Sequence, residues 1–385
     1  MANEAEKFGL PQVLIDFKTK GVTAIKRSAR GIVVMILKNE TENTIKNYVI
    51  NDVADIPEKG LTDENVDYIK KCLLGTPLRI LVYTLPLDTV EVTAGEGEEA
   101  PDRQTQADVL KLIDGIKWNW LCAPTSTVQE QQDLASWIKS ERQNKRKTFK
   151  AVLANQAADN EGVVNFTSSG IKVASGTDED GNVTYKAYTA LEYTARICGI
   201  LAGLALDRSA TYFKLTEVAE VDPVPEIDDH IDKGEMVLFD EQDGDGVKIA
   251  RACNSLATFT TDKGEDFRYI KIVEAVDMIT DDIRDTFKKY YTGKVINDYD
   301  HKMLFIAAIL VYFDEIKGNV LDRDGNNTVD IDEQYQRNYA KLKGEDVEKM
   351  DAMTIRKYNT GTNVVLAGSI KPVNAMEDLK IVFTM

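Results

Sequence analysis

The last residues of the chain carry the feature that most constrains the fold, because they form a β-strand pattern that must find a partner. Leu379, Ile381 and Phe383 alternate with the residues between them, and this period of two is typical of a strand. Pro372 cannot donate a backbone hydrogen bond, so it fits the end or the edge of a strand. A strand at a terminus pairs either with the edge of its own sheet or with the sheet of another chain. The pattern therefore predicts an arm that adds a strand to a sheet.

The first residues have the same character. Val13, Ile15 and Phe17 alternate with their neighbours, which predicts a second strand-forming arm. A basic stretch at 23–31 follows this arm and leads into an apolar run at 32–37, which we predict to be a strand. The alternating apolar residues at each end are therefore the candidates for arm side chains.

Length and charge set the class of protein. A chain of 385 residues exceeds the usual size of a single core, so two or three domains are expected. A mean hydropathy of −0.29 and 29% charged residues are typical of a soluble, folded protein. The net charge of −17 argues against nucleic acid as a partner and favours a cation, a basic protein surface or further copies of the chain.

The apolar residues do not indicate a secreted or membrane-spanning chain. The N-terminal residues contain no apolar core and no cleavage signal, so no secretory peptide is predicted. The longest apolar run spans 303–313, which is shorter than the roughly 20 residues needed to cross a bilayer. We predict that this run forms a buried helix and that the chain does not insert into a membrane.

The cysteines and histidines, which often act in catalysis or bind metals, do not cluster in the sequence. No pair of cysteines has the spacing of a metal ribbon or a redox motif, so we predict buried free thiols. The four cysteines are Cys72, Cys122, Cys198 and Cys253. His230 and His301 have no nucleophile motif beside them, and no glycine-rich nucleotide-binding motif occurs. We therefore predict no catalytic residue, no metal ligand and no cofactor.

Strands and helices alternate along much of the chain, which predicts an α/β fold with a partly parallel sheet. Between 45 and 84, a helix begins after the N-cap candidate Thr62 and ends at 75–77, and a strand follows at 78–84. This segment is expected to form a small β-α-β unit. Further strands are predicted at 118–122, 150–153, 163–166, 236–239 and 247–250, and further helices at 187–206, 272–287 and 334–342.

Two acidic segments interrupt this alternation. Residues 86–106 are poor in apolar side chains and contain several Gly and Glu, which predicts a mobile linker. Residues 221–233 contain two prolines among several carboxylates and mark a second break. Both segments are expected to separate folded parts of the chain.

Gly199 and Gly203 form a GxxxG motif inside the predicted helix at 187–206. In a membrane such a motif would indicate dimerisation of helices, but no segment here is long enough to span one. We therefore predict that the two glycines let this helix pack closely on the sheet.

An acidic loop at 322–333 resembles the calcium loop of an EF-hand. Oxygen-bearing side chains occupy positions 1, 3, 5, 9 and 12 of the loop, where a hard cation needs them. They belong to Asp322, Asp324, Asn326, Asp330 and Glu333. Asn327 stands where the loop requires glycine, and no second loop pairs with this one. The alternatives are a calcium site, as in a calcium-binding α/β enzyme or a calcium-regulated binding protein, and a solvated acidic turn.

Two basic clusters stand out from the acidic composition. One follows the N-terminal arm and the other lies near the end of a predicted helix, where positive charge is favoured. Their residues are Lys26, Arg27 and Arg30, and Arg142, Lys145, Arg146 and Lys147. A solvated surface explains either cluster, but each is also a candidate for charged contacts with an acidic face of a neighbouring subunit.

Both ends of the chain resemble a known family, the sheath subunits of contractile phage tails. The matching segments are Gly-Leu-Pro at 9–11, Thr-Ala-Ile-Lys-Arg-Ser at 23–28 with Arg-Gly at 30–31, Asn-Thr-Gly at 359–361 and Pro-Val-Asn-Ala-Met-Glu-Asp at 372–378. The chain looks most like the short sheaths of Gram-positive phages, defective prophages and R-type bacteriocins. The resemblance spans the whole chain in one order.

The resemblance implies an α/β (α+β) multidomain fold with extended β-strand arms at both termini. The N- and C-terminal parts are expected to build the core, with a peripheral α/β domain inserted between them. The expected division is an N-terminal arm at 1–22, a β-α-β part of the core at 23–90, an acidic linker at 91–106, the inserted domain at 107–230, a C-terminal core domain at 231–358, and C-terminal strands and an arm at 359–385.

The resemblance also implies a structural function without catalysis. Sheath subunits polymerise as hexameric rings around an inner tube and contract to drive that tube through the envelope of a target cell. The implied partners are further copies of the chain, the tail tube protein, and the baseplate and tail terminator proteins. The implied location is a virion tail or a phage-tail-like particle assembled in the bacterial cytoplasm. A type VI secretion sheath is disfavoured, because those sheaths are usually built from two chains.

Overall fold

The computed structural model describes residues 24–92 and 101–384, so the predicted N-terminal arm with Val13, Ile15 and Phe17 lies outside the described residues. The described chain forms two compact units. The large unit contains 26–289, 316–327 and 369–384, apart from the undescribed segment. The small unit contains 24–25, 290–315 and 328–368. These boundaries differ from those of the predicted domains.

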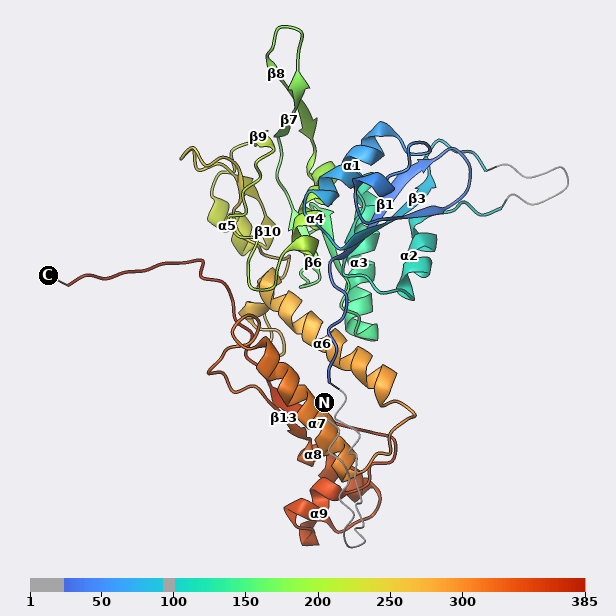
Figure 1. Ribbon diagram of the computed structural model, residues 1–385, viewed down its shortest axis with the longest axis vertical. Helices are drawn as coiled ribbons and strands as arrows, with labels where there is room; N and C mark the ends of the chain where they lie inside the picture. Colours follow the sequence, from blue (N-terminus) through green and yellow to red (C-terminus); the bar gives the residue numbers. More distant parts are fainter. Residues whose placement is uncertain (1–23, 93–100, 385) are drawn as a thin grey trace, which may run out of the picture. The chain divides into compact units, whose positions relative to one another are not determined.

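A seven-stranded sheet forms the centre of the large unit (Figure 1), in the order β10-β6-β5-β4-β1-β3-β2. All neighbouring strands are parallel except β2, which runs antiparallel to β3 at one edge. Parallel strands that are buried on both faces read as continuous apolar runs, as in the centre of this sheet. The strands are β1 (Ile32–Glu40), β2 (Lys46–Ile50), β3 (Arg79–Pro86), β4 (Trp120–Cys122), β5 (Lys150–Ala154), β6 (Val163–Phe166) and β10 (Glu235–Met236).

Helices cover both faces of this sheet, and alternate residues of β1 show why. Val33 and Met35 belong to a core with residues of α1 (Asp63–Leu73) and α4 (Ala190–Gly203). Val34 belongs to a second core with residues of α2 and α3. The bounds of these two helices are Gln106–Asp114 and Val128–Lys145. The period of two along the strand therefore places apolar side chains in both layers.

The helix and the strands predicted between 31 and 84 are confirmed, but the predicted pairing of the strands is not. Thr62 caps α1 by accepting a hydrogen bond from the backbone NH of Asn65, and the helix ends before Gly75. The predicted β-α-β unit at 45–84 is wrong, because β2 is antiparallel to β3. The parallel unit is β1-α1-β3. The sheet also joins strands from both sides of the acidic segment at 91–106.

The GxxxG motif packs closely, but its partner is α1 rather than the sheet. A Cβ on Gly199 would lie 2.0 Å from the carbonyl oxygen of Cys72. A Cβ on Gly203 would lie 1.8 Å from the carbonyl oxygen of Gly75. Glycine at these positions lets the backbone of α4 approach the C-terminal end of α1.

Two smaller sheets complete the large unit. The antiparallel pair β11 (Leu238–Phe239) and β12 (Lys248–Ile249) confirms the strands predicted at 236–239 and 247–250. The three-stranded sheet β8-β7-β9 was not predicted. Its strands are β7 (Ile171–Thr177), β8 (Val183–Tyr188) and β9 (Val218–Glu220). The predicted break at 221–233 contains the short helix α5 (Ile227–Asp232).

A long amphipathic helix, α6 (Ile270–Tyr290), follows in the chain and confirms the helix predicted at 272–287. The 3-10 helices of the described chain are η1 (Val53–Asp55), η2 (Glu265–Arg268) and η3 (Val347–Lys349).

The small unit is built around most of α7 (Tyr299–Ile316), which contains the predicted buried run. Phe305, Ile309 and Tyr312 of this helix are buried. The side-chain amide of Gln336 donates to two carbonyls at the end of α9 and thereby joins α8 to α9. The remaining elements are β13 (Thr328–Ile331), α8 (Glu333–Leu342), α9 (Ala352–Lys357) and β14 (Leu366–Ser369).

The structure also bears on the predictions for the cysteines and for membrane insertion. All four cysteines are free and buried, as predicted. Among the described residues, no helix combines the length and the apolar character that crossing a bilayer requires.

Candidate assembly surfaces

The C-terminal arm, residues 370–384, is anchored to the large unit by backbone hydrogen bonds. The NH of Val373 donates to the carbonyl oxygen of Val320 over 2.9 Å. The NH of Asp322 donates to the carbonyl oxygen of Lys371 over 2.8 Å. Together with the bridge at Pro372, these bonds hold the root of the arm antiparallel to 320–322.

A second anchor follows a few residues later. The guanidinium of Arg251 donates to the carboxylate of Asp378 over 2.5 Å and lies 3.8 Å from that of Glu377. The hydroxyl of Thr211 donates to the same Glu377 carboxylate over 2.9 Å. An open groove of about 820 Å³ lies beside this anchor, and 375–378 form part of its wall.

Beyond Asp378 the arm is exposed. Residues 379–384 have no regular secondary structure, so the predicted strand is not formed within the described chain. Leu379 and Phe383 are each 86% exposed and Ile381 is 59% exposed. The pattern predicted a strand because the side chains alternate, but a strand also needs a backbone partner. This strand was expected to pair either with an edge of its own sheet or with the sheet of another chain. The described part of the chain does not supply the first of these partners.

The small unit contains a sheet with room for further strands. It consists only of β13 and β14 among the described residues. The two strands approach closely, since a Cβ on Gly368 would lie 2.1 Å from the carbonyl oxygen of Thr328. A two-stranded sheet is marginally stable alone, and exposed edges are templates for strand addition.

The structure brings the two predicted basic clusters together along α6. The backbone NH of Lys26 donates to the hydroxyl of Thr286 over 3.2 Å. Two residues earlier in α6, the guanidinium of Arg284 donates to the backbone carbonyl of Arg146 over 2.6 Å. Segments more than a hundred residues apart therefore meet on one helix of the large unit.

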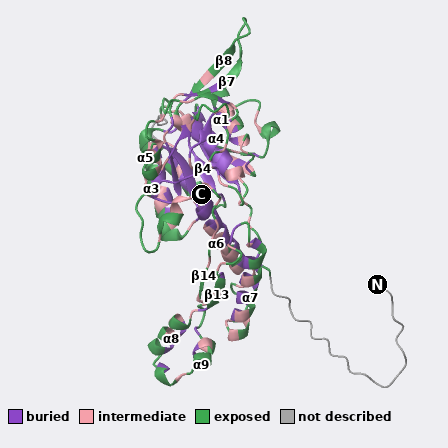
Figure 2. Cartoon of the chain, turned by 90° about the vertical axis from the view of Figure 1, so that its left-hand side faces the viewer, coloured by how far each residue is buried: buried purple, intermediate pink, exposed green. Residues whose placement is uncertain are grey.

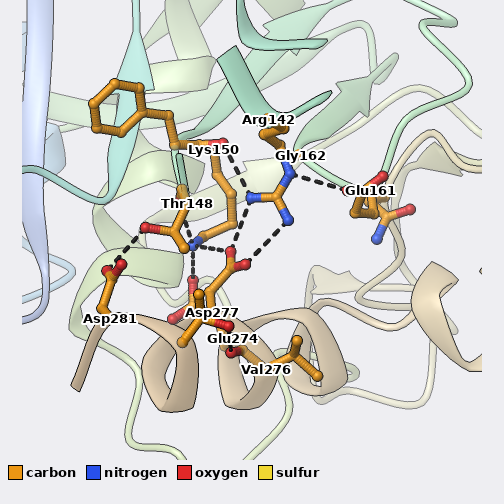
Figure 3. A network of polar contacts seen from close by, with 12 residues as sticks. Arg142, Thr148, Lys150, Glu161, Gly162, Glu274, Val276, Asp277 and Asp281 are labelled. Carbon is orange, nitrogen blue, oxygen red and sulfur yellow. Dashed lines mark hydrogen bonds and ion pairs between the residues drawn. The ribbon is translucent and has the colours of Figure 1, made fainter. Parts of the chain in front are cut away.

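Arg142 lies inside this region rather than on the surface (Figure 3). Its guanidinium donates to both carboxylate oxygens of Asp277, over 2.9 and 3.0 Å, and to Glu161 over 3.1 Å. The ammonium of Lys150 lies 2.9 Å from Asp277 and 3.0 Å from Glu274. Three of these ion pairs join the C-terminal end of α3 and the start of β5 to α6, and the fourth joins α3 to Glu161 in the segment before β6. Arg142 is thus committed to internal partners.

In this network, burial and the neighbouring opposite charges shift the pKa of each group in opposite directions. Burial lowers the pKa of Lys150, although the carboxylate of Asp277 favours its charged form. Burial also opposes ionisation of Asp277, but Arg142 and Lys150 hold its pKa below the ordinary value. The sequence gives one signal for this site: Asp277 stands one helical turn after the buried Val273 of α6.

Apart from Arg30, the remaining predicted cations are more accessible than Arg142. Arg30 is largely buried and pairs with Glu274. The side chain of Lys145 is 49% exposed and pairs with Asp114 and Glu141, and Lys147 also reaches Asp114. The accessible cations of both clusters, which we call the basic end, are Lys26, Arg27, Lys145, Arg146 and Lys147. Their proposed contacts with other subunits remain a prediction.

The carboxylates of the acidic loop at 322–333 form ion pairs with cations of the same chain. In the large unit, Asp322 pairs with Lys371 over 2.7 Å. In the small unit, Asp330 and Glu333 pair with Arg356 over 2.7 and 2.8 Å. The hydrogen bond from Arg356 lowers the pKa of Asp330. The described residues contain no group of three or more His, Cys, Asp or Glu placed to hold a metal ion. The geometry therefore does not support the calcium alternative.

Comparisons with known proteins agree with the predicted resemblance. The family model described as the phage tail sheath protein central domain matches residues 103–255, and that described as the phage tail sheath C-terminal domain matches 262–385. The chain is 33% identical to the tail sheath protein of Clostridium phage phiCD119, over 97% of this chain and 98% of the relative.

Solved structures show the same fold. The sheath tail protein of Listeria innocua matches with a TM-score of 0.62 and 18% identity, covering 91% of this chain and 94% of the other. The helical sheath of the anti-feeding prophage in its contracted state matches with a TM-score of 0.65 and 14% identity, covering 98% and 99%. Since a relative above 30% identity matches over nearly the full length of both chains, this chain belongs to the phage tail sheath protein family.

Proposed function

We propose that the chain is the subunit of a contractile sheath. Copies polymerise as hexameric rings around an inner tube and rearrange to drive that tube through the envelope of a target cell. The observation that carries the proposal is the segment at 379–384, which combines exposed apolar side chains with a backbone that has no strand partner in the described chain. The fold it shares with a sheath in a contracted state supports the same function.

The arms link the subunits. Hydrogen bonds of the backbone supply the affinity of strand addition, and alternate side chains fix its register. Leu379, Ile381 and Phe383 of one copy pack on the sheet that they extend, which we assign to β13 and β14 of a neighbouring copy. The N-terminal arm acts in the same way through Val13 and Ile15, together with Phe17.

Contraction then follows as a mechanical change. The folded units of each subunit repack while the arms act as hinges that keep neighbouring subunits connected. The tube, baseplate and terminator proteins are the other partners, and the exposed cations of the basic end add charged contacts. The particle is a phage tail or a tail-like particle assembled in the bacterial cytoplasm. This function is mechanical and uses no cofactor.

The test is assembly of the full chain with the tube protein of the same particle, followed by electron microscopy and sedimentation. Wild-type protein should form hollow tubes with stacked six-fold rings. The triple variant L379S/I381S/F383S should leave the subunit folded but abolish these tubes, because the strand loses its apolar face. The matched control K380S/T384S changes the opposite face and should assemble.

Two results would contradict parts of this proposal. Wild-type protein that stays a small monodisperse species with and without the tube protein would refute the sheath function. Tubes formed equally well by the triple serine variant would leave the sheath function standing but refute the role of the C-terminal arm.

A further inference from the structure

The hairpin of β7 and β8 has a firmly held root. The hydroxyl of Tyr188 donates to the carboxylate of Asp67 over 2.5 Å, and the ammonium of Lys186 lies 2.7 Å from the same carboxylate. Ile171 and Val173 on the facing strand are buried in the core. These contacts fix the direction in which the hairpin leaves the large unit.

The distal half of the hairpin is exposed on both faces. Figure 1 shows it projecting from the large unit, and Figure 2 shows it in the colour of exposed residues. Val183 is 50% and Tyr185 is 49% exposed. Both lie on β8, which is an edge strand of its sheet in the described chain. Between 183 and 185 this edge carries no charged side chain, and Lys186, which follows on the strand, is paired with Asp67 at the root. The distal part therefore lacks the charges that usually protect such edges from pairing.

The tip of the hairpin is an acidic turn held by hydrogen bonds to its own backbone. The carboxylate of Asp178 accepts hydrogen bonds from the backbone NH groups of Asp180 and Asn182, over 3.0 and 2.8 Å. This leaves Glu179 and Asp180 with exposed side chains at the outermost part of the turn. A held root and an ordered tip present these two carboxylates in a fixed direction, which favours recognition without further ordering.

The basic end lies at the opposite end of the same unit. Figure 1 shows the C-terminal end of α3 beside α6, far from the hairpin. In a chain of net charge −17, five cations gathered in one place are the exception, with Asp114 as the carboxylate that pairs with Lys145 and Lys147 among them. Arg146 is exposed and lies just past the end of α3, with a positive φ of 55° that directs the chain away from the helix.

We propose that the acidic tip of one copy docks on the basic end of a second copy. Because the two surfaces lie at opposite ends of one unit, the contact joins copies head to tail. Such heterologous contacts repeat into rings or open helical arrays, as a sheath requires. Val183 and Tyr185 of the hairpin then pack on the aliphatic stems of the lysines in the basic end. The inference rests on the proposed function and assigns one of its intersubunit contacts.

Charge reversal tests the contact in the full chain. The variant E179K/D180K should need about tenfold more protein to assemble than wild type, because several charged contacts per subunit become repulsive. The variant R27E/R146E should show the same defect. Combining all four substitutions in one chain should restore assembly, since the charges are complementary again. Thermal unfolding of each subunit should stay unchanged, because all four side chains are exposed.

A matched control changes the same number of carboxylates elsewhere. Glu58 and Asp262 are exposed and lie on other parts of the large unit. The variant E58K/D262K has the same net charge as E179K/D180K and should assemble like wild type. A defect in this control equal to that of E179K/D180K would show that only net charge matters and would overturn the proposal.

Zero-length cross-linking of carboxylates to amines identifies the partner directly. In assembled wild-type protein, Glu179 or Asp180 should be joined to Lys145 or Lys147, and the same pair should be absent from unassembled subunits. Cross-links from the hairpin to the tube protein, or normal assembly of E179K/D180K, would overturn the inference while leaving the sheath function intact. Wild-type protein that forms no polymer would instead refute the sheath function on which the inference depends.

Discussion

The ion pairs around Asp277 and those around Arg251 both join segments that are distant in the sequence, but they differ in their access to water. Asp277 is 6% exposed and its partners Arg142 and Lys150 are also buried. At the second anchor of the arm, the side chain of Asp378 is 76% exposed and that of Arg251 is 26% exposed, whereas that of Glu377, 3.8 Å from Arg251, is 7% exposed. The ion pairs around Asp277 therefore lie inside the protein, whereas the pair of Arg251 with Asp378 is open to solvent on the side of the carboxylate.

This difference separates a fixed joint from a releasable one. A buried pair is costly to break, because removing one partner leaves an uncompensated charge in the interior. An exposed pair is weak and is screened by salt. The buried pairs should therefore hold α6 more firmly than the exposed pair with Asp378 holds the C-terminal arm. A subunit whose arms change their surroundings while its folded units persist needs both kinds of joint.

The largest expected effect is that of removing the central carboxylate. Asp277→Ala leaves Arg142 and Lys150 buried without their shared partner and should lower the free energy of unfolding by about 3–5 kcal/mol. Urea denaturation followed by circular dichroism measures this loss. The control is Asp378→Ala in the arm, which should change the free energy by less than about 1 kcal/mol. Equal effects of the two substitutions would break the distinction between the joints.

The second expected effect is a loss of folding stability at low pH. The pKa of Asp277 in the folded state lies below its unfolded value, so the unfolded chain binds more protons between the two. Stability from this group is complete above the unfolded pKa of about 4 and is lost as the pH falls through the folded pKa. Glu161 acts in the same direction, because Arg142 and Lys263 lower its pKa against the effect of burial.

Denaturation at a series of pH values between 7 and 3 checks this behaviour. The wild type should lose stability steeply at the acid end, and Asp277→Asn should show a shallower decrease over the same range. A parallel decrease in the two proteins would mean that Asp277 does not contribute to acid stability.

The third effect concerns the arm alone. Arg251→Ala removes the exposed pair with Asp378, which contributes about 0–1 kcal/mol. The buried Glu377 keeps its hydrogen bond from Thr211, so the unfolding midpoint should change little. Hydrogen exchange of the amides around Glu377 and Asp378 should nevertheless become faster, since the arm loses its second anchor. Raising the salt from about 0.1 M to about 1 M should produce part of the same change in the wild type. Unaltered exchange in the variant would mean that Arg251 does not hold the arm.

Some features of the fold could be predicted from the sequence and others could not. Local patterns sufficed for the buried run of α7, the cap at Thr62 and the parallel strands, because each depends on neighbouring residues. The network around Asp277 could not be predicted, because it joins residues that only the folded chain brings together. The β7–β8 hairpin was missed because its distal half is exposed on both faces, so no alternation of burial marks it.

The C-terminal arm shows how a correct pattern led to an incomplete structure. The alternation at 379–384 predicts a strand, but Leu379, Ile381, Val382 and Phe383 are all exposed, so neither face of it is buried in the described chain. A strand forms only when its backbone finds a partner, and the described chain supplies none for these residues. Which of these residues take part in pairing, and where they bind, therefore stays a prediction.

The smallest expected effect is at the first anchor of the arm. Lys371→Ala removes an ion pair with Asp322, but the side chain of Lys371 is 69% exposed and the pair is open to solvent. The neighbouring backbone hydrogen bonds to Val320 and Asp322 remain and hold the root. We therefore expect no measurable change in unfolding and no faster exchange of the Val373 amide. Faster exchange at Val373 would show that this root is also a releasable joint, and the hinge of the arm would then lie nearer to β14.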